Sequence, residues 1–289
     1  MIFSKYNRQI FIQGIFFLIF FTGCANFPFR VVDINFDDPS AKLGIQNVKP
    51  TAEEADGVVL RFFPPNGGRL SAREETTMYH FVKDGRGMEM KFDREMTILT
   101  APGSREDSYM NGMKSVFKGE AGEADEKTEV TTRGEILQFI QGFHKSKYGK
   151  LIITNWRRAP MLPEWKIKIG DHWSYDEIMD VRIDSRWVKQ EDPLPYIIKA
   201  ESELAGFALV GRTRCVVIKT RMTETKQERL KVLFKELVMN ITANVEELIY
   251  LDYQTGTLTA KITKIHSEAT DSKMTMTNKG ESQSIYYLL

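Results

Sequence analysis

The amino-acid sequence predicts a mainly β protein in which one large antiparallel sheet curves into a half-barrel or barrel-like form. The clearest support is strict alternation between residues 88 and 93, where Met88, Met90 and Phe92 are each followed by a charged residue. Glycine-rich turn sequences, such as Asp-Gly-Arg-Gly at 84–87, separate many short runs of this kind. A flat sheet with so many strands would leave long exposed edges, so we expect it to curl.

The expected strands follow one another along the chain with few interruptions. We expect about ten to thirteen strands and at most two or three helices. The clearest strands are expected at residues 58–63, 70–82, 88–99, 151–156, 165–175, 196–208, 212–223, 237–253, 257–265 and 273–289.

Four segments are harder to assign. Residues 109–116 fit either a short helix or a strand, and residues 119–127 are small and acidic, which is typical of an exposed loop. A hairpin is expected near Arg133, although residues 136–143 also fit a helix. Residues 225–235 are charged and carry leucines at helical spacing, so we expect a short helix there.

The chain divides into four expected parts. Residues 1–23 are expected to be a signal peptide, and residues 24–57 a lipidated N-terminus and tether, in which Val31, Val32 and Ile34 are compatible with an edge strand. Residues 58–159 form a first β half and residues 160–289 a second. The two halves follow a similar order of strands and turns, which leaves a structural repeat open.

The N-terminus has the layout of a secretory signal. Lys5 and Arg8 precede an almost wholly apolar run at 10–21, which is too short to span a bilayer as a helix. The run ends in Phe-Thr-Gly-Cys at 21–24, which resembles the lipobox of bacterial lipoproteins, with Phe21 in the place of the usual leucine. The resemblance implies that Cys24 is lipidated and begins the mature protein. The alternative is an ordinary signal peptide in which Cys24 is incidental.

Charge and cysteine content exclude several classes of function. Without residues 1–23 the chain has 38 basic and 39 acidic residues, so no strong field of one sign exists to attract nucleic acid. With Cys24 lipidated, Cys215 is the one remaining thiol, and no intrachain disulfide can form. No Cys/His cluster has the spacing of a zinc site.

The sequence contains no recognisable catalytic motif, cofactor motif or metal motif. Cys215 lies within an apolar run, where a buried thiol that acts as a small hydrophobic residue is expected rather than a nucleophile. The acidic residues at 171–180 do not have the spacing of a calcium loop, and a solvated face is expected. Trp156-Arg157-Arg158 and Arg186-Trp187 fit either exposed recognition anchors or internal cation–π packing. The histidines are scattered through the chain: His80, His144, His172 and His266.

Part of the second half resembles an uncharacterised family of mostly-β bacterial secreted proteins and lipoproteins. The resemblance covers about residues 160–266 and depends on short motifs at 162–163, 169–173, 211–218 and 251–258. It implies structural roles only, namely turn glycines with positive φ and a tryptophan that anchors a core. These residues are Gly170, Gly211, Gly256 and Trp173.

Together these patterns predict a non-enzymatic envelope lipoprotein. We expect it to be held at the membrane through lipid on Cys24, and to bind a protein, lipid or surface ligand with its β domain. No cofactor, metal or nucleic acid is expected. Ala25 follows the lipidation site where the enteric rule places aspartate for inner-membrane retention, which favours the outer membrane. The alternative is an enzyme of hydrolase type whose site is assembled only in the fold.

Overall fold

A computed structural model describes the chain in several stretches. They are residues 36, 38–62, 68–81, 87–118, 122–146, 149–156, 160–184, 188–190, 196–232, 235–271 and 277–289. Within them lie two short helices, α2 (Pro39–Leu43) and α3 (Ala52–Ala55). The fourteen strands are β1 (Ile45–Val48), β2 (Arg69–Phe81), β3 (Gly87–Pro102), β4 (Ser108–Lys118), β5 (Gly122–Thr131), β6 (Ile136–Ser146), β7 (Gly149–Trp156), β8 (His172–Asp184), β9 (Val188–Gln190), β10 (Tyr196–Val210), β11 (Thr213–Val232), β12 (Lys235–Asp252), β13 (Thr257–Asp271) and β14 (Thr277–Leu288).

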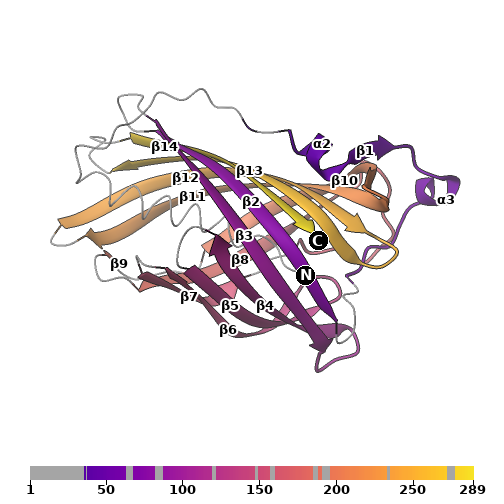
Figure 1. The fold of residues 1–289 in the computed structure, drawn as a ribbon, viewed down its shortest axis with the longest axis horizontal. Helices are drawn as coiled ribbons and strands as arrows, with labels where there is room; N and C mark the ends of the chain where they lie inside the picture. Colours follow the sequence, from indigo (N-terminus) through magenta and orange to yellow (C-terminus); the bar gives the residue numbers. More distant parts are fainter. Residues whose placement is uncertain are drawn as a thin grey trace.

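All fourteen strands belong to one curved antiparallel sheet, so the predicted fold class is confirmed. The strand order is β1-β10-β11-β12-β13-β14-β2-β3-β4-β5-β6-β7-β8-β9, and β8 pairs in addition with β10. That pairing brings the two ends of the order together. Figure 1 shows β11–β14 in the upper part of the view and β4–β7 in the lower part, with β2 and β3 running obliquely from one to the other. The expected boundary near residue 160 falls between β7 and β8 and does not divide the sheet.

The sheet has an inner face, which carries the main apolar core. Along β2, β3 and β10–β14, alternate side chains are buried, and cross-strand partners point to the same side. Ile98, Val216, Ile249 and Leu251 are among the fully or almost fully buried side chains of this core. This burial has the period of two that is typical of strands with one buried face. The side chains of Met88, Met90 and Phe92, where the alternation was clearest in the sequence, lie outside the described residues.

One end of the sheet is filled by residues 57–62 and 160–171, which do not extend the sheet as strands. We call this the closed end, and we include in it the neighbouring turns at 103–108 and 131–135. The apolar run at 58–63 was expected to be a strand, but in its described part only Val58 pairs, through a single bridge to Ile167. Leu60 and Phe62 are completely buried in the core instead. A short apolar run indicates burial, and here burial did not require a ladder of strand pairs.

The strand expected at 165–175 begins only at His172. Ile167 is completely buried in the closed end, whereas Trp165 and Ile169 on either side of it are 56% and 46% exposed. The apolar alternation here marks one inserted side chain rather than a strand. Trp173 is buried as expected, and its indole Nε1 donates to the carbonyl of Met161 at 2.7 Å.

Two other sequence predictions were wrong. The two segments that fitted either a helix or a strand both form strands. The segment expected as a loop at 119–127 enters β5 at Gly122, and the helix expected at 225–235 is replaced by β11, which runs to Val232. Pairing of β11 with β12 from Val216 to Val232 overrides the helical spacing of its leucines. Residues 109–116 lie in β4 and 136–143 in β6. The hairpin near Arg133 is confirmed.

Residues 36–57, expected to belong to the tether, contain ordered elements that lie on the outside of the sheet. We call this segment the strap. Phe36 packs edge-on against Tyr79 of β2, and β1 pairs with β10. Leu43 packs on an apolar patch of the outer face that includes Cys215 and Tyr250. Most of this segment therefore acts as part of the domain.

The far end of the strap is fixed by a buried carboxylate. Glu54 in α3 accepts hydrogen bonds from Arg214 Nε and Nη2, both at 2.6 Å, and from the Tyr253 hydroxyl at 2.8 Å. Thr51 and Glu54 also form a reciprocal capping box at the start of α3. The Arg214 guanidinium, chiefly, lowers the pKa of Glu54 to about 2.

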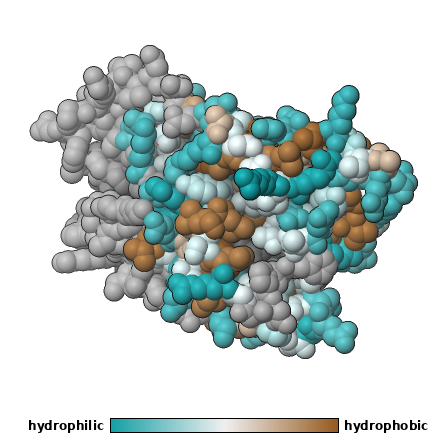
Figure 2. All heavy atoms as spheres, turned by 45° about the vertical axis from the view of Figure 1, so that its right-hand side comes forward, coloured by the Kyte–Doolittle hydropathy of each residue, from teal (hydrophilic) through white to brown (hydrophobic). Residues whose placement is uncertain are grey.

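Beyond the strap, the outer face of the sheet is charged. Arg73 of β2 donates to Asp93 of β3 at 2.9 and 2.5 Å, and Arg221 of β11 donates to Glu246 of β12 at 3.2 Å. In the space-filling view, apolar residues form separate islands among hydrophilic ones (Figure 2). Within the described residues, no helix combines the length and apolar character that a membrane span requires.

Candidate functional site

A row of polar side chains crosses six neighbouring strands on the inner face. We call it the polar belt. Each member lies directly opposite the next in the strand register, and all are buried. In order from β10 to β2 they are Ser202, Thr220, Glu247, Thr263, Ser284 and Thr76.

The belt satisfies much of its own hydrogen-bonding capacity. Hydroxyl pairs lie 2.8 Å apart at Ser202 and Thr220, and 2.7 Å apart at Thr76 and Ser284. Thr263 donates to Glu247 at 3.4 Å. Buried polar groups usually need such partners, so the belt is a stable polar surface inside the sheet.

Two ion pairs adjoin the belt on the side of the closed end. Lys261 pairs with Glu247 of the belt, and Arg94 pairs with Glu74 at 2.5 Å with both side chains at most 1% exposed. Tyr286 lies between the two pairs in the register, opposite both Lys261 and Glu74. Burial raises the pKa of the Tyr286 hydroxyl, so it stays protonated and remains a donor. The inner face therefore presents charges of both signs together with hydroxyl groups.

On its other side the belt is followed by apolar side chains, which we call the apolar zone. Ile198, Ala200 and Met222 form one buried cluster, against which Tyr175 and Val245 pack. Five neighbouring inward residues of β12 and β13 are also apolar and buried, namely Met239, Ile241, Ala243, Ile265 and Ala269. Ser267 and Asp271 of β13 point to the same side, and Asp271 is buried.

Some buried hydroxyls on the inner face lack a hydrogen-bond partner among the described residues. They belong to Tyr109 and Ser115 of β4 and to Ser282 of β14. Burial raises the pKa of Tyr109, which keeps its proton. An unpaired buried hydroxyl costs free energy on folding, and a bound water or a polar group of a ligand would recover it.

A charged pair lies within the apolar zone on β11. Glu224 and Lys226 are two residues apart, point inward, and keep only 12% and 7% of their side-chain surface exposed. The Lys226 Nζ atom is 3.5 Å from Glu224 Oε1. Desolvation, only partly offset by Glu224, lowers the pKa of Lys226 to about 8.

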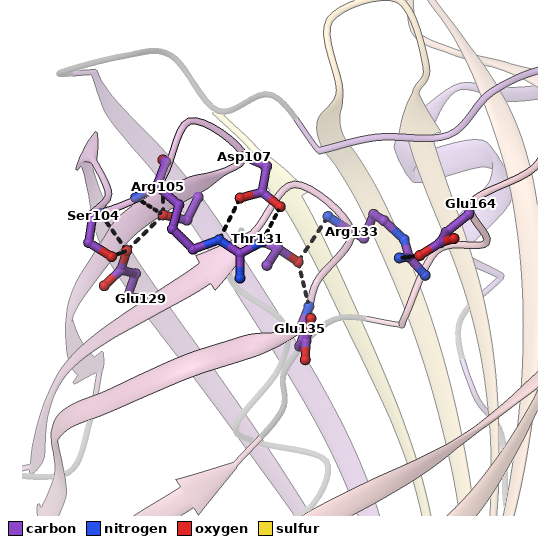
Figure 3. Close-up of polar contacts among 9 residues, drawn as sticks. Ser104, Arg105, Asp107, Glu129, Thr131, Arg133, Glu135 and Glu164 are labelled. Carbon is purple, nitrogen blue, oxygen red and sulfur yellow. Dashed lines mark hydrogen bonds and ion pairs between the residues drawn. The ribbon is translucent and has the colours of Figure 1, made fainter.

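Figure 3 shows a second polar cluster, at the closed end. Glu129 accepts hydrogen bonds from the backbone and hydroxyl of Ser104, at 2.5 and 2.7 Å, and from the Ser108 hydroxyl at 2.7 Å. These donors lower the pKa of Glu129, with Ser108 the largest contributor. Glu129 thereby fixes the loop between β3 and β4. The carboxylate faces two serines and no histidine in this cluster, so the arrangement is that of a loop anchor.

The same cluster joins the loops of the closed end to one another. Thr131 Oγ1 accepts from the backbone of Arg133 and of Glu135 at 3.3 and 3.1 Å (Figure 3). Arg133 donates to the carbonyl of Leu162 at 3.2 Å and pairs with Glu164. The closed end is therefore held by polar contacts around an apolar core, and we place the candidate site on the inner face beyond it.

The structure does not describe several of the residues that the sequence singled out. These are Phe21, Cys24 and Ala25, and the side chains of His80, His144, Trp156, Arg157, Arg158, Arg186 and Trp187.

Cys215 is a buried free thiol on the outer face, and burial raises its pKa to about 11. It does not lie on the inner face with the polar belt. His172 is exposed near Glu203, and His266 pairs with Glu281, so the structure does not bring these two together. Of the acidic segment 171–180, Asp171 accepts from the backbone of Lys168 at 2.8 Å as part of a turn. In the portion of the chain that the structure describes, no group of side chains is arranged to hold a metal ion.

Sequence reasoning missed the polar belt. Its members are isolated serines, threonines and one glutamate. Each lies in a strand whose polar and apolar residues alternate, and none differs in the sequence from an ordinary strand residue. Only the register between strands places them in one row. A usable signal was present at Glu74, Glu247 and Lys261, because they occupy inward positions of the alternation where apolar residues are expected.

No protein-family model and no curated protein matches the sequence. Similar solved structures include a loop-deletion mutant of OmpT, an outer membrane protein of Vibrio cholerae, with 10% identity, a TM-score of 0.23, and coverage of 76% of this chain and 99% of the other. Pseudomonas aeruginosa OccK5 (OpdH) has 9% identity and a TM-score of 0.25, with coverage of 79% and 99%. The outer membrane protein opdK from the same organism has 7% identity and a TM-score of 0.25, with coverage of 78% and 99%. TM-scores this low assign neither a family nor an activity to this chain.

Proposed function

We propose that this protein is a lipid-anchored bacterial envelope protein that binds an amphiphilic ligand on the inner face of its sheet without catalysing a reaction. One observation carries the proposal. A buried row of polar groups lies beside a buried apolar zone on the same strands. An amphiphile has the same division, since its polar group needs hydrogen bonds and its chain needs apolar contact.

The described inner face supports binding better than catalysis. Two of its acids are paired with bases, Glu74 with Arg94 and Glu247 with Lys261. The thiol of Cys215 lies on the other face with its pKa raised. Tyr109, Ser115 and Ser282 offer hydroxyls that a bound ligand could engage.

The expected location rests on the N-terminal sequence. A basic start, a short apolar run and Cys24 in a lipobox-like motif support lipid anchoring, and Ala25 favours the outer membrane. The outer face of β2, β3, β11 and β12 carries ion pairs, which suits a surface in contact with water. The resemblance of residues 160–266 to secreted proteins and lipoproteins agrees with this proposal.

A steric block in the apolar zone tests the binding proposal. Val245 of β12 is half-buried on the inner face, whereas its neighbour Asn244 is exposed on the outer face. Val245→Trp should weaken binding of a fluorescent acyl-chain probe at least about tenfold, and Asn244→Trp should leave it unchanged. Equal unfolding midpoints for the two variants would show that the fold is retained. A wild-type protein that binds no acyl-chain probe would overturn the proposal.

A further inference from the structure

We infer that the Glu224–Lys226 pair recognises a zwitterionic head group that contains both an anionic group and a primary ammonium, such as a phosphoethanolamine lipid. This inference rests on the proposed function, because it assigns a ligand class to the same inner face. It starts from the placement of the pair. Both residues point inward from β11, opposite Ala243 and Ile241, which are 3% and 1% exposed.

Charges placed there are costly unless something compensates for them. Charged groups removed from water are retained at a net benefit only with good geometry and further hydrogen bonds. The 3.5 Å between Lys226 Nζ and Glu224 Oε1 is longer than a charge-assisted hydrogen bond, which is about 2.7–2.9 Å. Glu224 Oε1 accepts no hydrogen bond from the described residues. Glu224 Oε1 is therefore an acceptor that a donor of the ligand can satisfy.

The pair as a whole is neutral, and the buried Asp271 of β13 also points to the inner face. This pattern of charge selects the ligand. A purely anionic head group would be attracted by Lys226 but repelled by Glu224. A purely cationic head group would be attracted by Glu224 but repelled by Lys226. A zwitterion can place its phosphate at Lys226 and its ammonium at Glu224. A primary ammonium also has N–H donors for Glu224 Oε1, which a quaternary ammonium lacks. The acyl chain would then lie against the apolar zone around the pair, which includes Met222, Ile241 and Ala243.

Native mass spectrometry of the full chain, titrated with three lysolipids of equal chain length, tests this inference. The lipids carry phosphoethanolamine, phosphocholine or phosphoglycerol head groups. We expect the phosphoethanolamine lipid to bind at least tenfold more tightly than the other two. Free phosphoethanolamine, which has no chain, should bind too weakly to be detected.

Matched variants assign the preference to the two side chains. Glu224→Gln should remove the preference for phosphoethanolamine over phosphoglycerol, and Lys226→Met should weaken binding of both phosphate lipids about tenfold. Glu246→Gln and Lys219→Met make the same chemical changes on outward positions of the same strand pair and should change nothing. Lys226→Arg keeps the charge and should retain the preference, which separates a binding defect from a folding defect.

The outcomes distinguish this inference from the proposed function. Equal affinity for the three head groups, with binding still abolished by Val245→Trp, would overturn the head-group inference and leave amphiphile binding intact. A preference that survives Glu224→Gln would also overturn it. Absence of binding by all three lipids would overturn both.

Discussion

At the scale of single residues, the inner face is notable for charges that have been removed from water. Arg94 and Glu74 are at most 1% exposed, and Lys261 is 4% exposed beside Glu247. Such pairs cost desolvation free energy and add little net stability compared with apolar residues of the same volume. Their effect is to favour one strand register, because a slip of one strand would leave a charge buried on the inner face without its partner.

Removal of one partner of the buried Arg94–Glu74 pair should strongly destabilise the fold. Arg94→Ala leaves the Glu74 carboxylate buried without its cation, so we expect the free energy of unfolding to fall by about 3–5 kcal/mol. The double variant Glu74→Leu/Arg94→Met should recover most of this loss. Denaturant unfolding measures both. Arg221→Ala removes an exposed partner of Glu246 and should cost less than about 1 kcal/mol. Equal losses for Arg94→Ala and Arg221→Ala would contradict the buried pairing.

Glu54 should make stability depend on pH. Arg214 lowers the folded-state pKa to about 2 from an ordinary value of 4.5, so the stabilisation is complete above about pH 4.5 and is lost as the pH falls toward 2. A shift of this size corresponds to an upper bound of about 3 kcal/mol. Glu54→Gln should remove this component from a plot of unfolding free energy against pH. An unchanged slope between pH 2 and 4.5 would contradict the assignment.

At the scale of elements, polar contacts fix the loops and the strap to the sheet. Hydrogen bonds to Glu129 and Thr131 fix the loops of the closed end, and Glu54 fixes the strap to β11 through Arg214. These contacts join residues far apart in sequence and appear in no local pattern.

Gly103 is the position where the loop between β3 and β4 tolerates no side chain. A Cβ atom there would lie 2.2 Å from Ser108 Oγ and 2.7 Å from Glu129 Oε1. Gly103→Ala should therefore lower the free energy of unfolding by about 1–3 kcal/mol. Gly112→Ala is the matched control, since its Cβ would meet atoms only at 3.7 Å and beyond. A Gly103→Ala protein as stable as Gly112→Ala would show that the loop can rearrange freely.

The strap should protect the thiol of Cys215. Leu43 packs in the same outer cluster as Cys215, whose pKa is raised to about 11 by burial. Leu43→Ala should therefore speed alkylation of Cys215 by a maleimide at least about tenfold at pH 8. Lys42→Ala alters the exposed neighbour of Leu43 and should leave the rate unchanged. Peptide mapping identifies the modified cysteine, and equal rates would mean that Leu43 does not cover it.

At the scale of the whole molecule, Cys24 should decide where the protein is found. Thiol titration of the denatured mature protein should detect one thiol, Cys215, because a thioether consumes the other. Cys24→Ser should move the protein from the membrane fraction to the soluble fraction, whereas Cys215→Ser should leave it with the membrane. Intact-mass analysis would contradict the proposal if the mature N-terminus lay elsewhere without lipid.

The sequence alone determined the fold class and most of the strands. Alternation at β2, β3 and β12 depends on the geometry of a single strand, and the turn glycines Gly170 and Gly211 have the positive φ that their motifs predicted. Such features are local, and a single chain segment displays them in full. The same local signals failed at residues 58–62 and 225–235, where burial and strand pairing with distant segments decided the outcome.

Only the tertiary structure decided which polar residues form a site. Ser202 and Thr76 stand 126 positions apart in the sequence and yet end the same row, because five strand pairings in register join them. The pairing of β8 with β10 likewise depends on the curvature of the entire sheet. A strand specifies which of its side chains share a face, but which side chains they meet is set by register, a property of the assembled sheet.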